Sequence, residues 1–445
     1  MEDHQLSPGR NLSEEATINL CVCTSWWLGL THGGVDRIKN FTRNVSRNGV
    51  NVYLVDRSIE KSLSGLIWDK DRYQEIKDGV SYARNYPSYV RFLLPGMIKF
   101  FQEVLNLWAS LLTAIKGLGL FLPDPYLIVK LFFVCRKERI DIIQFEFPST
   151  AFSSFIVKKV TGIPLIYDAH NIESERLGSM KNASKLFVAL MKRMELMSCN
   201  VSDSVFVVSE NDRARLLSWG IPEKKVTVIP NSVELDKFSP AIDGCRIRDK
   251  YSLRNSFVII FHGFLSYQPN REAAQILLDL FPSLLRKYGS VRLLLVGKNP
   301  PETSPHPNII VTGFVENVQE YIAAADLAVV PLLSGGGTKL KMLEYMACGK
   351  AIVSTMKAAE GLDLEHEKDV LMSRYPDSEF TNLVLRSIED SNLRKKIGTN
   401  ARKKVEKLYN WEKNAKKAVG IYRNLVYKRQ AWNRETYITP SLSRR

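Results

Sequence analysis

The chain has 445 residues, of which 45% are hydrophobic and 24% charged, and it carries a formal net charge of +15. This length and composition predict a globular protein with two domains, each with its own core. The positive charge predicts an anionic partner. Nucleic acid is not expected to be that partner, since the sequence has no zinc-finger, RRM-like or helix-turn-helix pattern and no regular stripe of basic and aromatic residues.

Six cysteines lie scattered along the chain, and their spacing suits neither a zinc site nor a disulfide framework, as is typical of a reducing cytosol. They are Cys21, Cys23, Cys135, Cys199, Cys245 and Cys348. Residues 1–16 contain no basic segment that leads into an apolar one. We therefore expect a flexible N-terminal tail in place of a signal peptide, and a cytoplasmic protein.

Strands and helices alternate from residue 17 onward, which favours a doubly wound parallel sheet. The first strand is expected in TINLCVCTSW (17–26) and the second in VNVYLVD (50–56), with a loop containing Gly33 and Gly34 and then a helix between them. Further buried strands are expected at 140–148, 163–171, 202–210 and 225–231. Together these elements predict a first Rossmann-like domain over residues 17–236.

Between the second and third of these strands, residues 91–122 crowd Phe, Trp and Leu between isolated charges. Their uncharged stretches, 104–115 and 117–123, are too short to span a bilayer. Basic residues outnumber acidic ones across residues 84–139. An apolar helix pair with a basic rim is typical of a protein that lies on an anionic membrane surface, here through residues 91–139 on the inner face of the cell membrane. Packing of these helices within the domain or against a second subunit is the alternative.

A polar linker follows near residues 235–250, and a second series of strands then begins. These strands are expected at 256–264, 291–298, 308–315, 327–333 and 351–355, and they predict a second Rossmann-like domain over residues 237–410. Residues 411–430 are expected to form a helix that packs back towards the first domain, and residues 431–445 a basic tail. In such domains, ligands bind at the carboxyl ends of the strands.

One glycine-rich stretch, SGGGTKLKMLEYMACGK (334–350), lies at such a strand end. Glycines either turn the backbone or let a ligand approach its N–H groups. A buried strand precedes Gly335, Gly336 and Gly337, and an apolar helical pattern follows them. This order suits phosphate binding at a helix N-terminus, to which Lys339 adds a charge. The spacing is not that of a Walker loop, and a purely structural turn is the alternative.

The motifs, taken in their order along almost the whole chain, resemble those of a retaining family 4 glycosyltransferase with the GT-B fold. They are HGGV (32–35), YDAHN (167–171), IPNSVE (229–234), TGFV (312–315), EYMACGKAIVST (344–355) and EGL (360–362). The resemblance implies two facing Rossmann-like domains with a cleft between them. It also implies transfer of a sugar from a nucleotide-diphosphate sugar to a glycan, a lipid-linked or another acceptor, with retention of anomeric configuration.

The sequence departs from the family pattern at two places. Of two glutamates that the family separates by seven residues, Glu344 is kept and the first is replaced by Gly336. The Arg and Lys pair that holds the diphosphate after the first strand of the second domain is missing, because HGFLSYQPNREA offers only Arg271. The chain resembles a branch with GGGT followed by a basic residue. We therefore expect Lys339 to replace the missing cations and Lys341, two positions further along a helix, to face elsewhere.

On this resemblance, the expected catalytic residues are His170 and Lys339, and His32 is an expected acceptor contact. The expected donor-binding residues are Gly33, Gly34, Val315, Gly336, Gly337, Thr338, Lys339 and Glu344. Glu344 is expected at a helix start, where it would accept hydrogen bonds from both ribose hydroxyls, with a simple complement to the helix dipole as the alternative. Asp168 is expected to hold its loop.

No cofactor and no metal is expected, because Lys339 and the loop amides would stabilise the leaving diphosphate. The pattern Asp69-Lys70-Asp71 matches the metal-binding motif of the other major transferase fold, but it lies in a charged stretch and is interpreted as a coincidence. Two other functions stay open. One is a non-catalytic scaffold, suggested by the lost glutamate, and the other is a nucleotide-sugar epimerase, which shares the fold but whose acid and base residues we do not identify in this sequence.

Overall fold

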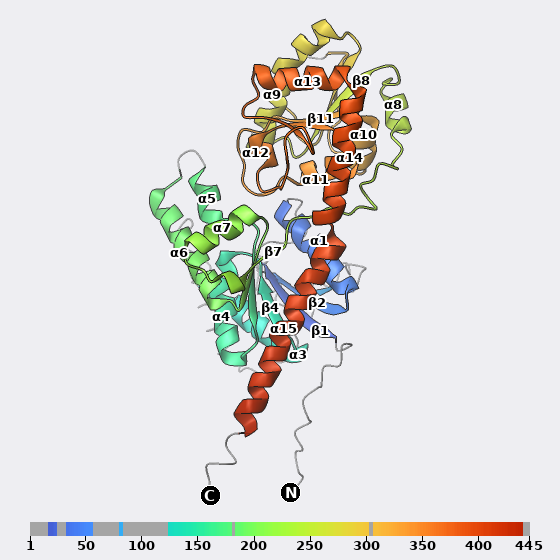
Figure 1. Cartoon of the computed structure of the whole chain (residues 1–445). Helices are drawn as coiled ribbons and strands as arrows, with labels where there is room; N and C mark the ends of the chain where they lie inside the picture. The colour runs from blue at the N-terminus through green and yellow to red at the C-terminus, as the bar shows by residue number, and fades with distance from the viewer. Residues whose placement is uncertain are drawn as a thin grey trace, which may run out of the picture. The chain divides into compact units, whose positions relative to one another are not determined.

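The computed structural model describes residues 17–24, 33–56, 80–82, 123–179, 183–301 and 306–438. It divides into two compact units (Figure 1): unit 1 comprises Met1–Ile229 together with Ala415–Arg445, and unit 2 comprises Pro230–Asn414. Four sequence predictions concern residues outside the described part of the chain. They are the tail at 1–16, the acceptor contact His32, the pattern at 69–71 and the apolar segment at 91–122.

Unit 1 contains a seven-stranded sheet in the order β3-β2-β1-β4-β5-β6-β7, in which every neighbouring pair is parallel. Its order reverses between β1 and β4, which is the switch point of a doubly wound sheet. Its strands are β1 (Ile18–Thr24), β2 (Val50–Asp56), β3 (Val80–Tyr82), β4 (Ile142–Phe145), β5 (Leu165–Ala169), β6 (Ser204–Val207) and β7 (Val226–Val228). Its α-helices are α1 (Gly33–Arg47), α3 (Pro125–Lys137), α4 (Pro148–Thr161), α5 (Glu173–Gly178), α6 (Lys185–Val201), α7 (Glu210–Ser218) and most of α15 (Trp411–Ile438).

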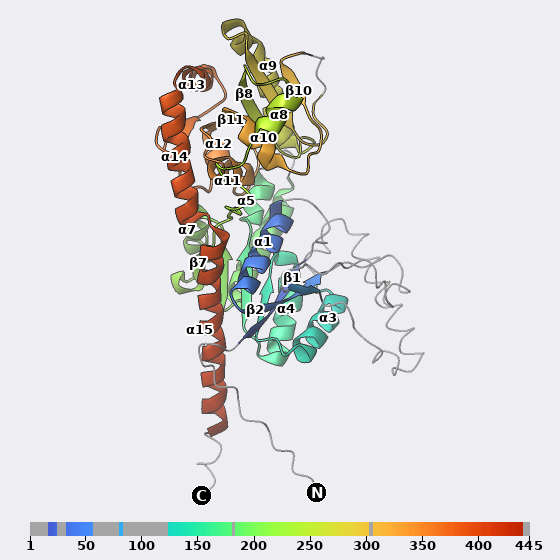
Figure 2. The ribbon, with the colours of Figure 1, turned by 90° about the vertical axis from the view of Figure 1, so that its right-hand side faces the viewer.

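Helices cover both faces of this sheet. Phe145 of β4 and Tyr167 of β5 stack on one face, in an apolar cluster with α3 and α4. On the other face, Tyr422 of α15 contacts Phe206 of β6, which in turn contacts Phe41 of α1. Helix α15 thus runs alongside the strands of unit 1, as Figures 1 and 2 show. Because side chains alternate along a strand, the neighbours of Phe145 and Tyr167 point to the face of α1 and α15.

Unit 2 contains a six-stranded parallel sheet in the order β10-β9-β8-β11-β12-β13. Its strands are β8 (Phe257–His262), β9 (Val291–Val296), β10 (Ile309–Val311), β11 (Leu327–Val330), β12 (Ile352–Thr355) and β13 (Leu371–Ser373). Its helices are α8 (Cys245–Lys250), α9 (Gln268–Lys287), α10 (Val318–Ala324), α11 (Leu340–Ala347), α12 (Met356–Ala359), α13 (Ser378–Glu389) and α14 (Ser391–Leu408). The predicted pair of doubly wound parallel sheets is confirmed.

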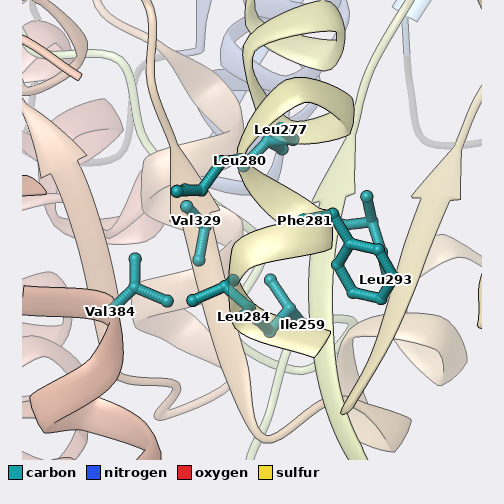
Figure 3. A pocket seen from close by; sticks show the side chains of 8 residues that line it. All are labelled: Ile259, Leu277, Leu280, Phe281, Leu284, Leu293, Val329 and Val384. Carbon is teal, nitrogen blue, oxygen red and sulfur yellow. The ribbon is translucent and has the colours of Figure 1, made fainter. Parts of the chain in front are cut away.

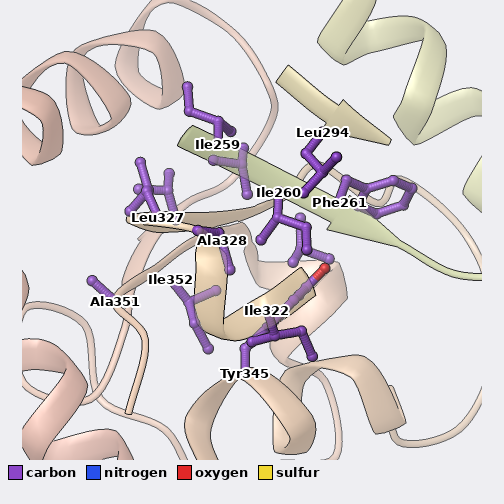
Figure 4. Close-up of a cluster of buried hydrophobic side chains, with 14 of the residues drawn as sticks. Ile259, Ile260, Phe261, Leu294, Ile322, Leu327, Ala328, Tyr345, Ala351 and Ile352 are labelled. Atoms are coloured by element: carbon purple, nitrogen blue, oxygen red, sulfur yellow. The ribbon is translucent and has the colours of Figure 1, made fainter. Parts of the chain in front are cut away.

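The core of unit 2 is built from the apolar runs that the sequence predicts as strands. Figure 4 shows Ile259, Ile260 and Phe261 of β8 within this core, and all three are at most 1% exposed. A small pocket also lies between α9 and the sheet, and Figure 3 shows the eight side chains that line it: Ile259, Leu277, Leu280, Phe281, Leu284, Leu293, Val329 and Val384. All eight are apolar and none can orient a sugar or a nucleotide, so we interpret this pocket as core packing.

Two predicted boundaries are wrong. Unit 2 begins at Pro230 and not at residue 237, because Val233 is buried in its core and donates its N–H to the Tyr409 carbonyl. Helix α15 continues to Ile438, so residues 431–438 belong to a helix and not to a tail. The reason is visible in the sequence, since no proline or glycine follows residue 430 until Pro440.

The described part of the predicted membrane-associated stretch contains α3. Leu127, Leu131 and Val134 of this helix are buried in the core of unit 1, so the helix packs within the unit. On its outer side, Val129 and Phe133 are 52% and 42% exposed. Among the helices of the described residues, none is both long enough and apolar enough to cross a membrane.

Candidate functional site

The glycine-rich loop lies at the carboxyl edge of the unit 2 sheet. The strand order reverses between β8 and β11. The loop follows β11, and His262 is the last residue of β8. Both therefore lie at the switch point, where doubly wound sheets bind their ligands.

Two of the three glycines in this loop adopt backbone conformations that other residues rarely reach. Gly335 has a φ of +105° and Gly337 a φ of +66°, which is the left-handed region that glycine tolerates. A Cβ built on Gly335 would lie 3.5 Å from the ring of Pro269, so the loop also packs closely on the start of α9. These glycines therefore turn the chain, and the turn leads directly into the N-terminus of α11.

Lys339 ends the loop and is the N-cap residue of α11. Its ammonium group donates to the carbonyl oxygens of Gly335, Gly336 and Gly337 at 3.1, 3.2 and 2.6 Å. Burial lowers the pKa of Lys339 to about 8. An ammonium group has three N–H donors, so the glycine loop engages all of them.

Lys341, in contrast, reaches the end of β8. Its Nζ donates to Asn270 Oδ1 at 2.6 Å and lies 4.1 Å from the ring centroid of Phe261. A Cβ added to Gly263 would lie 2.9 Å from this Nζ. Burial lowers the pKa of Lys341 to about 7, although the Glu344 carboxylate opposes this shift. The structure thus places a buried lysine beside the strand end where the sequence offers no Arg and Lys pair.

Glu344 pairs with a histidine from a neighbouring strand. Its Oε2 lies 2.6 Å from His262 Nε2, and its side chain is 23% exposed. The other ring nitrogen of His262 is buried and has no hydrogen-bond partner among the described residues. Because α11 begins at Leu340, Glu344 lies in the second turn, and the expectation that it lies at the helix start is wrong. The helix dipole acts mainly within the first turn, so it does not account for this glutamate.

The other predicted donor contacts differ in their surroundings. Thr338 has a buried hydroxyl without a hydrogen-bond partner among the described residues. Val315 is half-buried and packs against the core of unit 2, which leaves mainly its backbone for a ligand. Gly33 and Gly34 are the first residues of α1 in unit 1, so they form a helix N-terminus and not the predicted loop.

At the carboxyl edge of the unit 1 sheet, four ionisable side chains form a cluster, which we call the His170 cluster: Arg37, Glu146, Asp168 and His170. Their side chains are at most 4% exposed. Arg37 of α1 binds Asp168 through two hydrogen bonds, Nη2 to Oδ1 at 2.7 Å and Nε to Oδ2 at 3.1 Å. His170 Nε2 lies 2.7 Å from Glu146 Oε2. Burial and the Asp168 carboxylate raise the pKa of Glu146, while its hydrogen bond with His170 lowers it.

Glu146, Asp168 and His170 have the side-chain types that bind metal ions. One ligand atom of each lies within 4.8 Å of the other two. Their oxygens are already engaged by the protein, however. Both oxygens of Asp168 accept from Arg37, and Glu146 Oε1 accepts from Gln144 at 2.9 Å. The Arg37 guanidinium would also repel a cation at this short range. We therefore interpret these residues as the partners of His170 and not as a metal centre.

The sequence interpretation missed four of these residues: Arg37, Glu146, His262 and Asn270. The sequence did indicate Glu146, because polar and apolar residues alternate in IIQFEFP. This alternation places Glu146 and Gln144 on the face of the strand that does not carry Phe145. His262 ends a buried apolar strand in the same way as His170. No pattern in the sequence indicates that Arg37 from α1 or Asn270 from α9 reaches these strand ends.

Two family models match the chain, and together they cover more than half of it. The model Glycosyltransferase Family 4 matches residues 112–237, and the model Glycosyl transferases group 1 matches residues 256–390. The first match contains Glu146, Asp168 and His170. The second contains the glycine loop and Glu344.

The chain is also similar to individual relatives in sequence and to solved structures in fold. The UDP-Gal:alpha-D-GlcNAc-diphosphoundecaprenol alpha-1,3-galactosyltransferase of Escherichia coli is 26% identical over 317 residues, which cover 68% of this chain and 80% of that protein. The structure of sucrose-phosphate synthase from Thermosynechococcus elongatus has a TM-score of 0.67 at 15% identity. The match covers 92% of this chain and 100% of the synthase chain. The structure of Anabaena HepE in complex with UDP has a TM-score of 0.65 at 16% identity, and the match covers 92% of this chain and 100% of the HepE chain. These structures confirm the predicted GT-B fold.

Proposed function

We propose, from the premise that this chain belongs to the family 4 type of GT-B glycosyltransferases, that it transfers a sugar from a nucleotide-diphosphate sugar to an acceptor. One observation carries this proposal. At the unit 2 switch point, the glycine loop, the buried Lys341 and the pair of His262 and Glu344 lie together. They combine a helix N-terminus, a cation and a carboxylate, which are the groups that bind phosphates and a ribose.

The diphosphate is assigned to the N-terminus of α11 and to Lys341. This lysine lies beside Gly263, so its ammonium takes the place of the Arg and Lys pair that the family carries after this strand. Gly263 has no side chain, which lets the ammonium and Asn270 approach its backbone, because a Cβ there would lie 2.9 Å from Nζ. Lys339 is the second cation assigned to the leaving diphosphate, on which it acts through its charge. Its three N–H groups donate to the glycine carbonyl oxygens, so it also holds the loop.

The ribose is assigned to Glu344. Its contact with His262 leaves carboxylate lone pairs for two hydroxyl groups, because an ionised carboxylate accepts about four hydrogen bonds. Val315 and Thr338 are assigned to the donor as well, Val315 through its backbone. UDP is the nucleoside diphosphate to test first, since HepE, which shares the fold, has been solved with it.

The transferred sugar is assigned to His170 of unit 1, and the reaction is assigned as a hexosyl transfer that retains the anomeric configuration. Retention rests on the family resemblance. The acceptor is proposed to be a sugar linked to a lipid diphosphate, since the name of the Escherichia coli relative describes such an acceptor. An acceptor of this kind fits a cytoplasmic protein that associates with the inner face of the membrane, and the six free cysteines fit a reducing compartment.

The reaction is proposed to need no metal. The two lysines and the α11 N-terminus supply positive charge to the leaving diphosphate, which is the role that a divalent cation has in other transferases. Sugar transfer in the presence of excess EDTA tests this assignment. Equal rates with and without EDTA are expected, and loss of transfer that Mg²⁺ or Mn²⁺ restores would contradict it.

The donor site is tested by isothermal titration calorimetry of the full chain with UDP, GDP and UMP. Binding of one nucleoside diphosphate is expected, with weaker binding of the corresponding monophosphate, because the monophosphate leaves Lys341 without its phosphate. Equal affinity for UDP and UMP would contradict the assignment of Lys341. A chain that binds neither diphosphate would contradict the donor site as a whole.

A further inference from the structure

Besides His170, the His170 cluster contains one basic and two acidic side chains. Arg37 supplies one guanidinium, while Glu146 and Asp168 supply two carboxyl groups, and none of these side chains is more than 1% exposed. Arg37 satisfies Asp168 with two hydrogen bonds. Glu146 is therefore left with His170 as its one ionisable hydrogen-bond partner among the described residues.

Glu146 is itself held in place by a chain of hydrogen bonds that begins on the C-terminal helix. The Tyr422 hydroxyl of α15 donates to Gln144 Oε1 at 2.6 Å, and Gln144 Nε2 donates to Glu146 Oε1 at 2.9 Å. Gln144 and Glu146 point to the same face of the sheet, since they are two residues apart, and Tyr422 reaches Gln144 from the helix on that face. Glu146 Oε2 thus has a defined position opposite His170 Nε2.

His170 has one bound and one unbound ring nitrogen. Nε2 faces Glu146 at 2.7 Å, and Nδ1 is buried without a hydrogen-bond partner among the described residues. A buried polar atom without a partner is costly in a protein interior. The ring of Phe147 packs beside the imidazole with its centroid at 4.8 Å, which limits rotation of the ring. The orphaned Nδ1 is therefore the atom of His170 that can serve a substrate.

We propose that Glu146 is a positioning residue for the transfer reaction: it accepts the Nε2–H of His170, fixes this tautomer, and thereby presents Nδ1 as an acceptor for a hydroxyl group of the sugar. A neutral imidazole carries its proton on one ring nitrogen only, so a proton donated from Nε2 to the Glu146 carboxylate leaves Nδ1 as the acceptor. The inference rests on the proposed function for the role of the sugar, but the tautomer is a property of the protein alone.

The tautomer is measured by ¹⁵N NMR of the full chain with labelled histidine. The chain has six histidines, and the His170 signals are those that disappear in His170→Ala. A protonated Nε2 and an unprotonated Nδ1 are expected. In Glu146→Gln, the amide NH₂ can donate to Nε2, so a shift of the proton to Nδ1 is expected. Glu146→Asp keeps a carboxylate and is expected to keep the parent tautomer.

Asp326→Asn is the matched control for this measurement. Asp326 is a carboxylate of unit 2 that accepts from Arg248 at 2.9 Å and from the Val258 N–H at 2.8 Å. Its replacement by an amide is expected to leave the His170 signals unchanged. A parent protein with its proton on Nδ1, or a Glu146→Gln variant with the parent tautomer, would overturn the proposal.

A double-mutant cycle then separates positioning from a structural role. Glu146→Gln is expected to lower kcat roughly tenfold or more, with a smaller effect on KM, because the sugar contact acts through His170. In a His170→Ala background the same substitution is expected to have no further effect. Equal losses in both backgrounds would overturn the proposal. A parent protein that transfers no sugar contradicts the proposed function instead, and the NMR result still decides the tautomer.

Discussion

The carboxylate of Glu344 makes one hydrogen bond among the described residues, to His262. We expect Glu344→Gln to weaken UDP binding by about 1.5–3 kcal/mol, or roughly 10- to 100-fold, because an amide has fewer acceptor sites and no charge. The free energy of unfolding is expected to change little, since the side chain is partly exposed. Titration calorimetry measures the affinity.

Glu389→Gln is the control for this substitution. Glu389 lies on the surface of the same unit and forms an exposed ion pair with Lys287 at 2.9 Å. Exposed pairs contribute little to stability, and this one is remote from the glycine loop in the sequence. UDP affinity should stay at the parent value in this variant. Equal affinities for the parent protein and Glu344→Gln would remove the ribose assignment.

Lys341 makes UDP binding dependent on pH. Burial lowers the pKa of Lys341 to about 7 and that of Lys339 to about 8. At pH 7.5 Lys341 is thus mostly neutral and Lys339 mostly protonated. A bound diphosphate favours the ammonium form, so binding at this pH should take up protons, mainly at Lys341. The affinity should fall as pH rises from 7 to 9, because fewer molecules carry the cation. The charged group that opposes the shift of Lys341 is Glu344.

Calorimetry in two buffers with different ionisation enthalpies measures this proton uptake. We expect Lys341→Met to lose most of the uptake at pH 7.5 together with affinity for UDP. Lys339→Met should retain most of the uptake, since that lysine is already largely protonated. A Lys341→Met variant with the uptake and affinity of the parent protein would show that this lysine does not meet the diphosphate.

Helix α14 approaches the C-terminal end of α11 through two glycines. Gly349 follows α11 with a φ of +66°, and a Cβ built on Gly398 of α14 would lie 2.1 Å from the Gly349 carbonyl oxygen. Glycine within a helix normally costs stability relative to alanine. We expect Gly398→Ala to destabilise the protein by roughly 1–3 kcal/mol, because the methyl group overpacks this contact. Differential scanning calorimetry should show the loss as a lower Tm.

Gly420→Ala is the opposite case. Gly420 lies within α15, and a Cβ built on it meets no atom within 4 Å. This substitution should leave the free energy of unfolding unchanged or raise it by up to about 1 kcal/mol, since alanine is the better helix former. Equal effects of the two substitutions would contradict the close packing of α14 on α11.

Most strands could be predicted from the sequence because buried parallel strands are continuous apolar runs. β3 and β13 were missed, since each is short and lies outside a run of β-branched residues, unlike the equally short β7 and β10. Helix starts were less predictable. The apolar pattern of α11 does not reveal that Lys339 is its N-cap, and the position of Glu344 in the second turn follows from that cap.

The candidate sites could likewise be predicted only where their residues lie close together in the sequence. The glycine loop, His170 and Glu344 were found because they lie in contiguous motifs. Lys341 was expected to face away from the phosphate site, but its Nζ lies beside Gly263 at the end of β8, an approach that depends on how α11 packs beside β8. Contacts between residues far apart in the chain, such as Arg37 with Asp168, leave no local pattern.

Over the whole chain, a net charge of +15 favours anionic surfaces. We expect the full chain to co-sediment with vesicles of anionic phospholipid at low ionic strength and to dissociate when salt screens the charges. Vesicles of zwitterionic lipid are the control and should bind less protein. A chain that stays in the supernatant with anionic vesicles at low salt would contradict a membrane-associated acceptor site.

The central claim, that this protein transfers sugar from a nucleotide donor, is tested most directly by one assay. The full chain is incubated with UDP- and GDP-sugars and a sugar linked to a lipid diphosphate, and the released nucleoside diphosphate is measured beside the acceptor. We predict release of UDP or GDP in step with glycosylation of the acceptor, with both strongly reduced in Glu344→Gln. Unchanged donors would indicate a non-catalytic scaffold, and an isomeric nucleotide sugar would indicate an epimerase. Either result would contradict sugar transfer.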